Sequence, residues 1–67
     1  MDYFDYERVA REAGLSEAEL QAICEHVRAE FPDDQMMFEL HVLGACRSIR
    51  DGWVTKAEVL HALPIAA

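Results

Sequence analysis

Apolar residues recur every three or four positions through most of the chain, and no segment alternates strictly between apolar and polar residues. The first spacing is typical of one helix face, and alternation is typical of a half-buried strand. The sequence therefore predicts an all-α fold, a compact bundle of four short helices arranged as two helix-loop-helix hairpins. A chain of 67 residues supports one small core, so we expect a single helical domain over its whole length.

Capping signals place the first two predicted helices. Gly14 ends the first one, and Ser16 with Glu19 forms a capping box that starts the second at Glu17. Pro32 blocks continuation beyond about Phe31. The expected buried faces are Tyr3, Tyr6, Ala10 and Ala13 in the first helix, and Leu20, Ile23, Cys24, Val27 and Phe31 in the second.

The third predicted helix is apolar on two sides. Asp33 or Asp34 caps it, and the turn signal Asp51-Gly52 follows it. One side holds Met36, Leu40 and Leu43, and the nearly opposite side holds Phe38, Val42, Ala45 and Ile49. A helix with two apolar sides is either central in the fold or uses one side as an interface.

A second capping box, Thr55 with Glu58, opens a short fourth helix that ends before Pro64, with Val59, Leu60 and Leu63 pointing inward. The segment Asp51-Gly52-Trp53-Val54-Thr55-Lys56-Ala57-Glu58 resembles the back half of an EF-hand calcium loop, with its glycine bend and closing glutamate. The first and third loop positions fall on Arg47 and Ile49, which supply no oxygen ligand. We therefore expect the loop geometry without calcium.

The net charge of −7 lies in the first half of the chain. Up to Asp34 there are ten acids and three arginines, and from Gln35 onward three acids balance three bases. Such an acidic surface favours a basic partner. Six bases are too few to neutralise phosphates, so direct nucleic-acid binding is not expected. The acidic start and the lack of a long apolar run predict a cytoplasmic protein without a membrane segment.

The sequence predicts no enzyme, metal site or cofactor. The serines and Thr55 are explained by caps or helix ends, and no glycine-rich phosphate loop occurs. Glu19, His26 and Glu30 share one side of a helix but lack a fourth ligand. Cys24 and Cys46 do not form a CxxC pair, so we expect reduced, packed thiols.

Our first functional hypothesis is an inhibitor that covers a basic DNA-binding surface with carboxylates. In size, acidity, helical content and lack of catalytic motifs the chain is similar to the small phage-encoded anti-CRISPR proteins. That resemblance implies that the chain acts as a DNA mimic and that its partner is a basic nucleic-acid-binding complex of the Cascade type. It also implies that the chain is located in the host bacterial cytoplasm. The partner contacts we expect are Asp2, Asp5, Glu12, Glu19, Glu25 and Glu30.

The alternative hypothesis is an EF-hand-like helical interaction module of a bacterial regulatory system. In this hypothesis Met36, Leu40 and Leu43 dock a partner helix or a second copy, and the chain is a monomer or a weak homodimer. Phe4 and Trp53 are the large aromatics that the helical faces explain least. We expect Trp53 in the core, whereas Phe4 suits either the core or an apolar contact.

Overall fold

The computed structural model describes residues 4–62, which form four helices and no strand. These are α1 (Tyr6–Glu12), α2 (Glu17–Glu30), α3 (Gln35–Arg50) and α4 (Lys56–Ala62). The predicted all-α fold is confirmed. None of these helices is long and apolar enough to cross a bilayer. Tyr3 and Leu63, which we assigned to buried faces, lie outside the described residues.

Side-chain caps set where the helices begin. The carboxylate of Asp5 accepts a hydrogen bond from the amide of Arg8, which starts α1 at Tyr6. Both bonds of the first capping box are present, since Ser16 Oγ accepts from the Glu19 amide at 3.1 Å and Glu19 accepts from the Ser16 amide at 2.8 Å. The capping prediction for α2 is therefore confirmed.

The later caps follow the same chemistry. Asp34, one of the two predicted caps, accepts from the Met37 amide and starts α3. Thr55 and Glu58 exchange two bonds of 2.9 and 3.0 Å at the start of α4. Gly52 has a φ of +81°, a left-handed conformation that suits glycine and turns the chain after α3.

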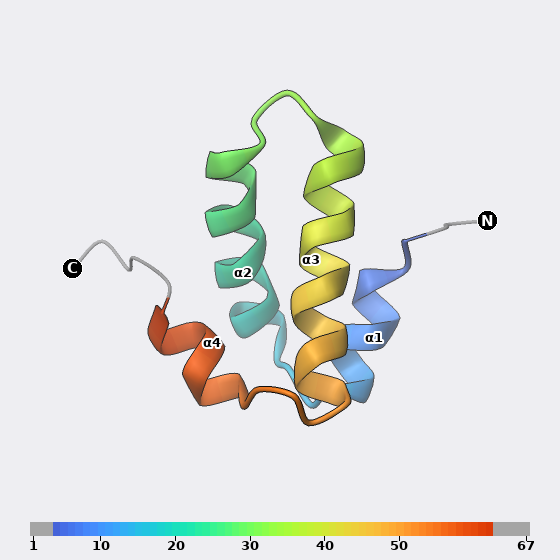
Figure 1. Cartoon of the computed structure of the whole chain (residues 1–67), viewed down its shortest axis with the longest axis vertical. Coiled ribbons are helices and arrows are strands. Elements are labelled where there is room, and N and C mark those ends of the chain that lie inside the picture. Colours follow the sequence, from blue (N-terminus) through green and yellow to red (C-terminus); the bar gives the residue numbers. More distant parts are fainter. Residues whose placement is uncertain (1–3, 63–67) are drawn as a thin grey trace.

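The α2–α3 pair is the centre of the fold (Figure 1). The two helices run side by side in opposite directions and are joined by the short turn at residues 31–34. α1 packs against α3, and α4 packs against α2. The first helices of the two predicted hairpins thus contact each other, and so do the second helices.

The core lies where α1, α2 and α3 meet. Ile23, Val42 and Cys46 have the largest side chains that are completely buried. Tyr6, Leu20, Cys24, Phe31, Val59 and Leu60 are partly buried against them. The remaining buried residues are Val9, Ala10, Leu15, Val27, Phe38 and Leu43.

The ring of Phe38 joins three helices. Tyr6 of α1 meets it edge to face, with the ring centroids 6.2 Å apart, and the guanidinium carbon of Arg28 of α2 lies 3.7 Å from its centroid. Arg28 also donates to Gln35 Oε1 at 2.7 Å, across the α2–α3 turn. A cation, two aromatic rings and an amide therefore fix how α1, α2 and α3 meet.

α3 uses only one of its two apolar sides for the core. Phe38 and Val42 are buried, whereas the Met36 and Leu40 side of the helix is open, with 61% and 43% of these residues exposed. Leu43, which we grouped with Met36 and Leu40, belongs to the core. Met36 and Leu40 therefore form an exposed apolar surface that no helix within residues 4–62 covers.

The expectation that Trp53 lies in the core is wrong, because the residue is 82% exposed. After α3, the amides of Gly52 and Trp53 donate to the carbonyls of Ile49 and Ser48, which closes the helix end. Val59 and Leu60 of α4 pack against the core at this end of the molecule. Phe4 is half-buried and also packs against the core.

Replacing Trp53 by alanine is expected to change the free energy of unfolding by less than about 0.5 kcal/mol, because a solvent-exposed ring contributes little to the core. Chemical denaturation followed by far-UV circular dichroism measures this. Ile23→Val is the matched core substitution and should cost about 1 kcal/mol. A loss at Trp53 larger than that at Ile23 would contradict the exposed position.

Candidate interaction surfaces

The carboxylates expected to contact a partner do not share one face. Asp2 lies outside the described residues, Asp5 and Glu12 belong to the start and end of α1, and the rest are on α2. Each of the five described ones makes a contact within the chain. They are Asp5, Glu12, Glu19, Glu25 and Glu30.

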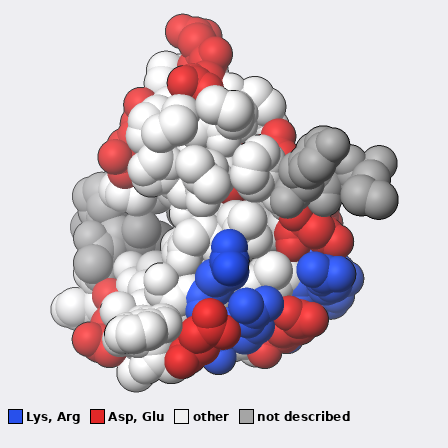
Figure 2. All heavy atoms as spheres, turned by 45° about the vertical axis from the view of Figure 1, so that its right-hand side comes forward, with Lys and Arg blue, Asp and Glu red and all other residues white. Residues whose placement is uncertain are grey.

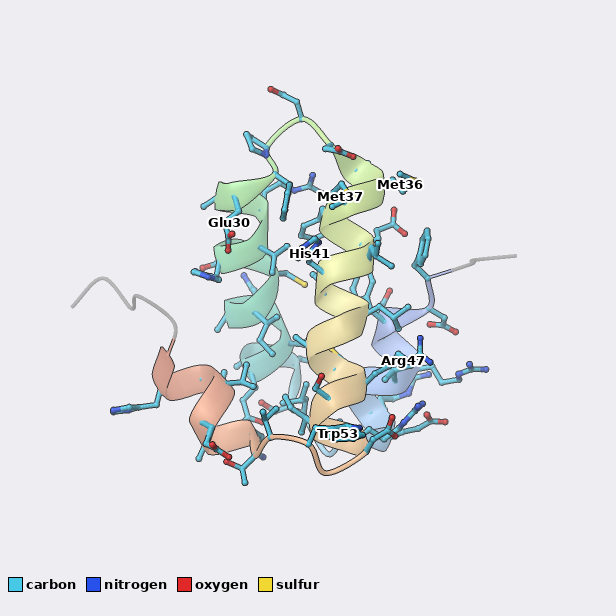
Figure 3. The ribbon with its side chains drawn as sticks, viewed as in Figure 1. Glu30, Met36, Met37, His41, Arg47 and Trp53 are labelled. Atoms are coloured by element: carbon cyan, nitrogen blue, oxygen red, sulfur yellow. The ribbon has the colours of Figure 1, made fainter. Side chains whose placement is uncertain are left out.

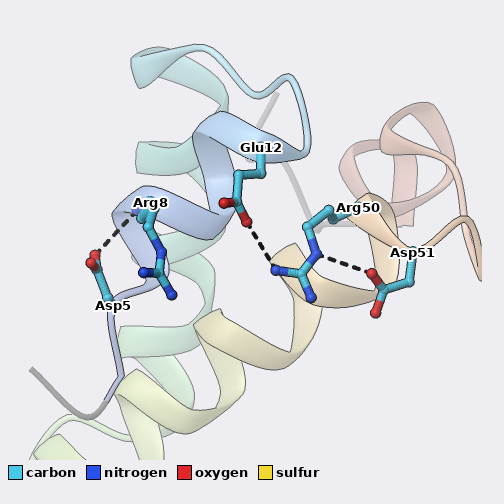
Figure 4. A network of polar contacts seen from close by, with 5 residues as sticks. All are labelled: Asp5, Arg8, Glu12, Arg50 and Asp51. Carbon is cyan, nitrogen blue, oxygen red and sulfur yellow. Dashed lines mark hydrogen bonds and ion pairs between the residues drawn. The ribbon is translucent and has the colours of Figure 1, made fainter.

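An arginine holds one of these carboxylates at the junction of α1 and α3 (Figure 4). Arg50 donates to Glu12 at 2.9 Å and to Asp51 at 3.0 Å. The hydrogen bonds that Arg50 donates to Asp51, and then to Glu12, raise the pKa of Arg50. The charge of Glu12 is therefore partly balanced within the molecule.

The carboxylates of α2 divide between two edges of the helix. Glu19 takes part in the capping box and pairs with Lys56 of α4 at 3.2 Å, and Glu30 lies 3.1 Å from His26. The hydrogen bond from the Ser16 amide holds the pKa of Glu19 below its ordinary value, and Lys56 adds to this. Glu25 accepts from Gln21 on the other edge and has no cation in contact within the described chain.

That second edge borders an acidic groove between α1 and α2. The groove is lined by Tyr6, Glu7, Glu17, Leu20, Gln21 and Cys24. Within residues 4–62 no ion pair involves Glu7 or Glu17. A second, smaller depression next to the groove is also lined by these two glutamates and contains one cation, Arg11. We did not assign Glu7 and Glu17 as contacts, although the spacing of Glu17, Gln21 and Glu25 along one row of α2 is visible in the sequence.

A different surface runs along α3. We call Met36, Leu40, Gly44 and Arg47 the α3 outer face, because all four are exposed and helical spacing places them on one side. Figure 3 shows Met36 and Arg47 on the same side of α3, with His41 on the side toward α2. The α3 outer face carries no acidic residue, although the whole chain has a net charge of −7.

Charged side chains are unevenly distributed over the surface of the molecule that Figure 2 shows. Acidic side chains gather at one end of the molecule, uncharged surface lies in the middle, and basic side chains gather among further acids at the other end. A shallow depression beside the α3 outer face is lined by Leu40, His41, Gly44, Ala45 and Ser48. An apolar strip bordered by charges is typical of protein-binding surfaces.

No group of three metal-ligating side chains occurs among the described residues. Glu19, His26 and Glu30, which share a side of α2, do not converge, because the Glu19 carboxylate contacts the Ser16 amide and Lys56. The ring of His41 lies against that of Phe31, with 4.6 Å between the centroids and a tilt of 40° between the ring planes. Its Nδ1 lies 2.9 Å from the Met37 carbonyl oxygen. These histidines have local structural contacts.

The segment that resembles half of an EF-hand loop forms a capped turn. Glu58, which would be the closing calcium ligand, accepts a hydrogen bond from the Thr55 amide. This bond, followed by that of the Thr55 hydroxyl, holds the pKa of Glu58 below its ordinary value. The Glu58 carboxylate thus caps the start of α4 and does not need an ion to be held in place.

In the comparisons with known proteins, no family model, curated protein or solved structure matches the chain.

Replacing Glu19 by glutamine is expected to remove part of the pH dependence of stability. The folded-state pKa of Glu19 is lowered, so its contribution is present above the ordinary glutamate pKa and is lost as pH falls through the folded-state value. The stability difference between wild type and Glu19→Gln should therefore shrink on acidification. Denaturation curves from neutral to acidic pH measure it.

Glu17→Gln is the control, because it makes the same change in the same turn of α2 without a capping bond at residue 17. Its stability difference from wild type should vary less with pH. Equal pH profiles for the two variants would refute the assigned role of Glu19.

The two thiols should differ in reactivity. Cys46 is 0% exposed, and this burial raises the pKa of its thiol to about 11. Cys24 is half-buried, and burial also raises the pKa of its thiol. At neutral pH a thiol reagent should modify Cys24 slowly and Cys46 only after unfolding. In the folded Cys24→Ala variant only Cys46 remains, so this variant should not react. Rapid modification of the folded variant would contradict the buried position of Cys46.

Proposed function

We propose that the chain is a non-enzymatic protein-binding module and that the α3 outer face is its docking surface. One observation supports this most strongly: Met36 is 61% and Leu40 43% exposed on a side of α3 that no other described helix covers. A small domain has few large apolar side chains to build its core, so leaving two of them exposed on one face reduces its stability. Burial against a partner recovers that free energy.

The rest of the α3 outer face suits a helical partner. Gly44 leaves a low point beside Leu40, where the backbone of another helix can approach closely. Methionine adapts its shape to different apolar surfaces. The face therefore fits an amphipathic helix that places an apolar residue on Leu40 and an acidic residue near Arg47.

An acidic inhibitor of a nucleic-acid-binding complex, of the anti-CRISPR type, is the second candidate. The acidic groove supports it, because Glu7 and Glu17 line the groove and Glu25 follows Gln21 of its lining by one helical turn. None of the three glutamates forms an ion pair among the described residues. The basic surface of such a complex would meet these three carboxylates. Glu12, Glu19 and Glu30 support this candidate less, because each of them already contacts a basic side chain within the molecule.

A pull-down from bacterial lysate with salt-graded elution is expected to distinguish the two surfaces. If the α3 outer face binds the partner, Leu40→Lys loses the captured protein, whereas the triple variant Glu7→Gln, Glu17→Gln, Glu25→Gln retains it. The complex should also survive about 0.5 M salt, because apolar contacts are little screened. Quantitative mass spectrometry of the eluates measures both effects.

Ala57→Lys is the matched control, since it adds the same charge at an exposed position of α4. It should bind as wild type does. Loss of the partner with the triple variant but not with Leu40→Lys, together with elution at low salt, would favour the acidic inhibitor and refute the docking role of α3.

A further inference from the structure

The acidic groove between α1 and α2 is a surface separate from the α3 outer face. Tyr6, Leu20 and Cys24 are half-buried in it and pack against the core, so they form an apolar floor. Glu7 of α1 and Glu17 of α2 also line the groove and are exposed. The groove therefore combines an apolar surface with two carboxylates from different helices.

The two carboxylates lie toward one end of the groove. Glu7, Glu17 and Leu20 line both the groove and the smaller depression beside it, so they lie where the two meet. Tyr6 and Cys24 line the groove but not the depression, which places them toward the other end. The groove thus has an acidic end over Leu20 and an apolar end.

No cation contacts the carboxylates of the acidic end within residues 4–62, because none of the ion pairs involves Glu7 or Glu17. Their charge is felt on the floor. Burial is the main cause that raises the pKa of the Cys24 thiol, and the negative charge of Glu7 raises it further. Arg28 opposes this effect, but its guanidinium lies on the ring of Phe38. The groove is therefore complementary to a cation supplied from outside.

Arginine fits this combination of groups better than other cations do. Its apolar stem packs along apolar surface, and its planar guanidinium donates hydrogen bonds to carboxylates on more than one side. The ammonium group of lysine is more strongly hydrated and acts as a point charge. A metal ion needs converging ligands, and no group of three metal-ligating side chains occurs among the described residues.

The length of the groove matches an extended peptide. Leu20 and Cys24 are one helical turn apart, which is about 6 Å along the axis of α2. In an extended chain, side chains two positions apart point to the same side and are about 7 Å apart. An arginine and an apolar residue two positions away from it therefore reach the two ends of the groove together.

We propose that the acidic groove binds an extended basic segment of another protein. The guanidinium of an arginine in this segment lies between Glu7 and Glu17, and its stem packs on Leu20. An apolar side chain two positions away packs on Tyr6 and Cys24. This inference goes beyond the docking role of the α3 outer face, because it assigns a ligand to a second surface.

NMR titration of the full ¹⁵N-labelled chain tests the proposal with two blocked tripeptides, leucyl-glycyl-arginine and arginyl-glycyl-leucine. At least one of them should bind and shift the amide signals of α1 and α2 around the groove. The same peptide with citrulline, which has the shape of arginine without its charge, should bind about tenfold more weakly. Lysine for arginine, or glycine for leucine, should each weaken binding about threefold.

Variants of the chain give effects of opposite sign. Glu7→Gln and Glu17→Gln should each raise the dissociation constant about threefold, as expected for exposed ion pairs. Arg11→Gln should lower it about twofold, because Arg11 is the cation that lines the depression beside these glutamates. Glu30→Gln is the matched control: it removes the same charge from the other edge of α2 and should leave the dissociation constant unchanged.

Bound peptide should also slow the modification of Cys24 by a thiol reagent, because Cys24 lines the groove. Several results would overturn the proposal. They are no binding of either peptide, equal binding of the citrulline or lysine peptide, shifts confined to α3, or equal effects of Glu17→Gln and Glu30→Gln.

The outcome is separable from that of the pull-down. Leu40→Lys changes the α3 outer face and should bind the tripeptide within about twofold of wild type, even where it loses the captured protein. Loss of the captured protein without peptide binding to any variant would leave the docking role of α3 standing and refute the groove as a site for arginine.

Discussion

The contact of three helices at Phe38 is the constraint on which the rest of the structure depends. Tyr6 from α1 and Arg28 from α2 approach the same ring, and Arg28 also reaches Gln35 at the start of α3. A small core has little surplus stability, so contacts that fix helix orientation are valuable beyond their buried area. α1 and α2 pack against this side of α3, and α4 packs against α2, so no helix of the described chain covers the opposite side of α3.

This division explains why the domain has two chemically different surfaces. Acidic residues dominate α2, which has four glutamates and one arginine, whereas the two glutamates of α1 are balanced by two arginines. Several of these carboxylates are used in caps or ion pairs. The exposed side of α3 lacks acids and keeps apolar residues in their place. Much of the net charge thus lies on α2 and in the turns that lead into α1 and α3, and the apolar strip of α3 is a separate surface.

Local signals predicted the fold well. The capping boxes at Ser16 and Thr55 determined helix starts, because their chemistry involves residues only three positions apart. The surfaces were less predictable. Glu12 and Arg50 are 38 positions apart, and no periodicity reveals that they pair. Trp53 was misplaced for a related reason: whether a turn residue faces inward depends on which distant side chains already fill the core.

Gly44 loses more conformational entropy on folding than an alanine would, so it lowers the stability of α3 by on the order of 0.5–1 kcal/mol. Nothing near it within the described chain requires the smaller residue. The monomer thus gives up stability at a place where its own packing gains nothing. Proteins often give up stability at positions that serve activity. In the docking role proposed for the α3 outer face, residue 44 is a position where a more stable domain and a binding-competent one call for different amino acids.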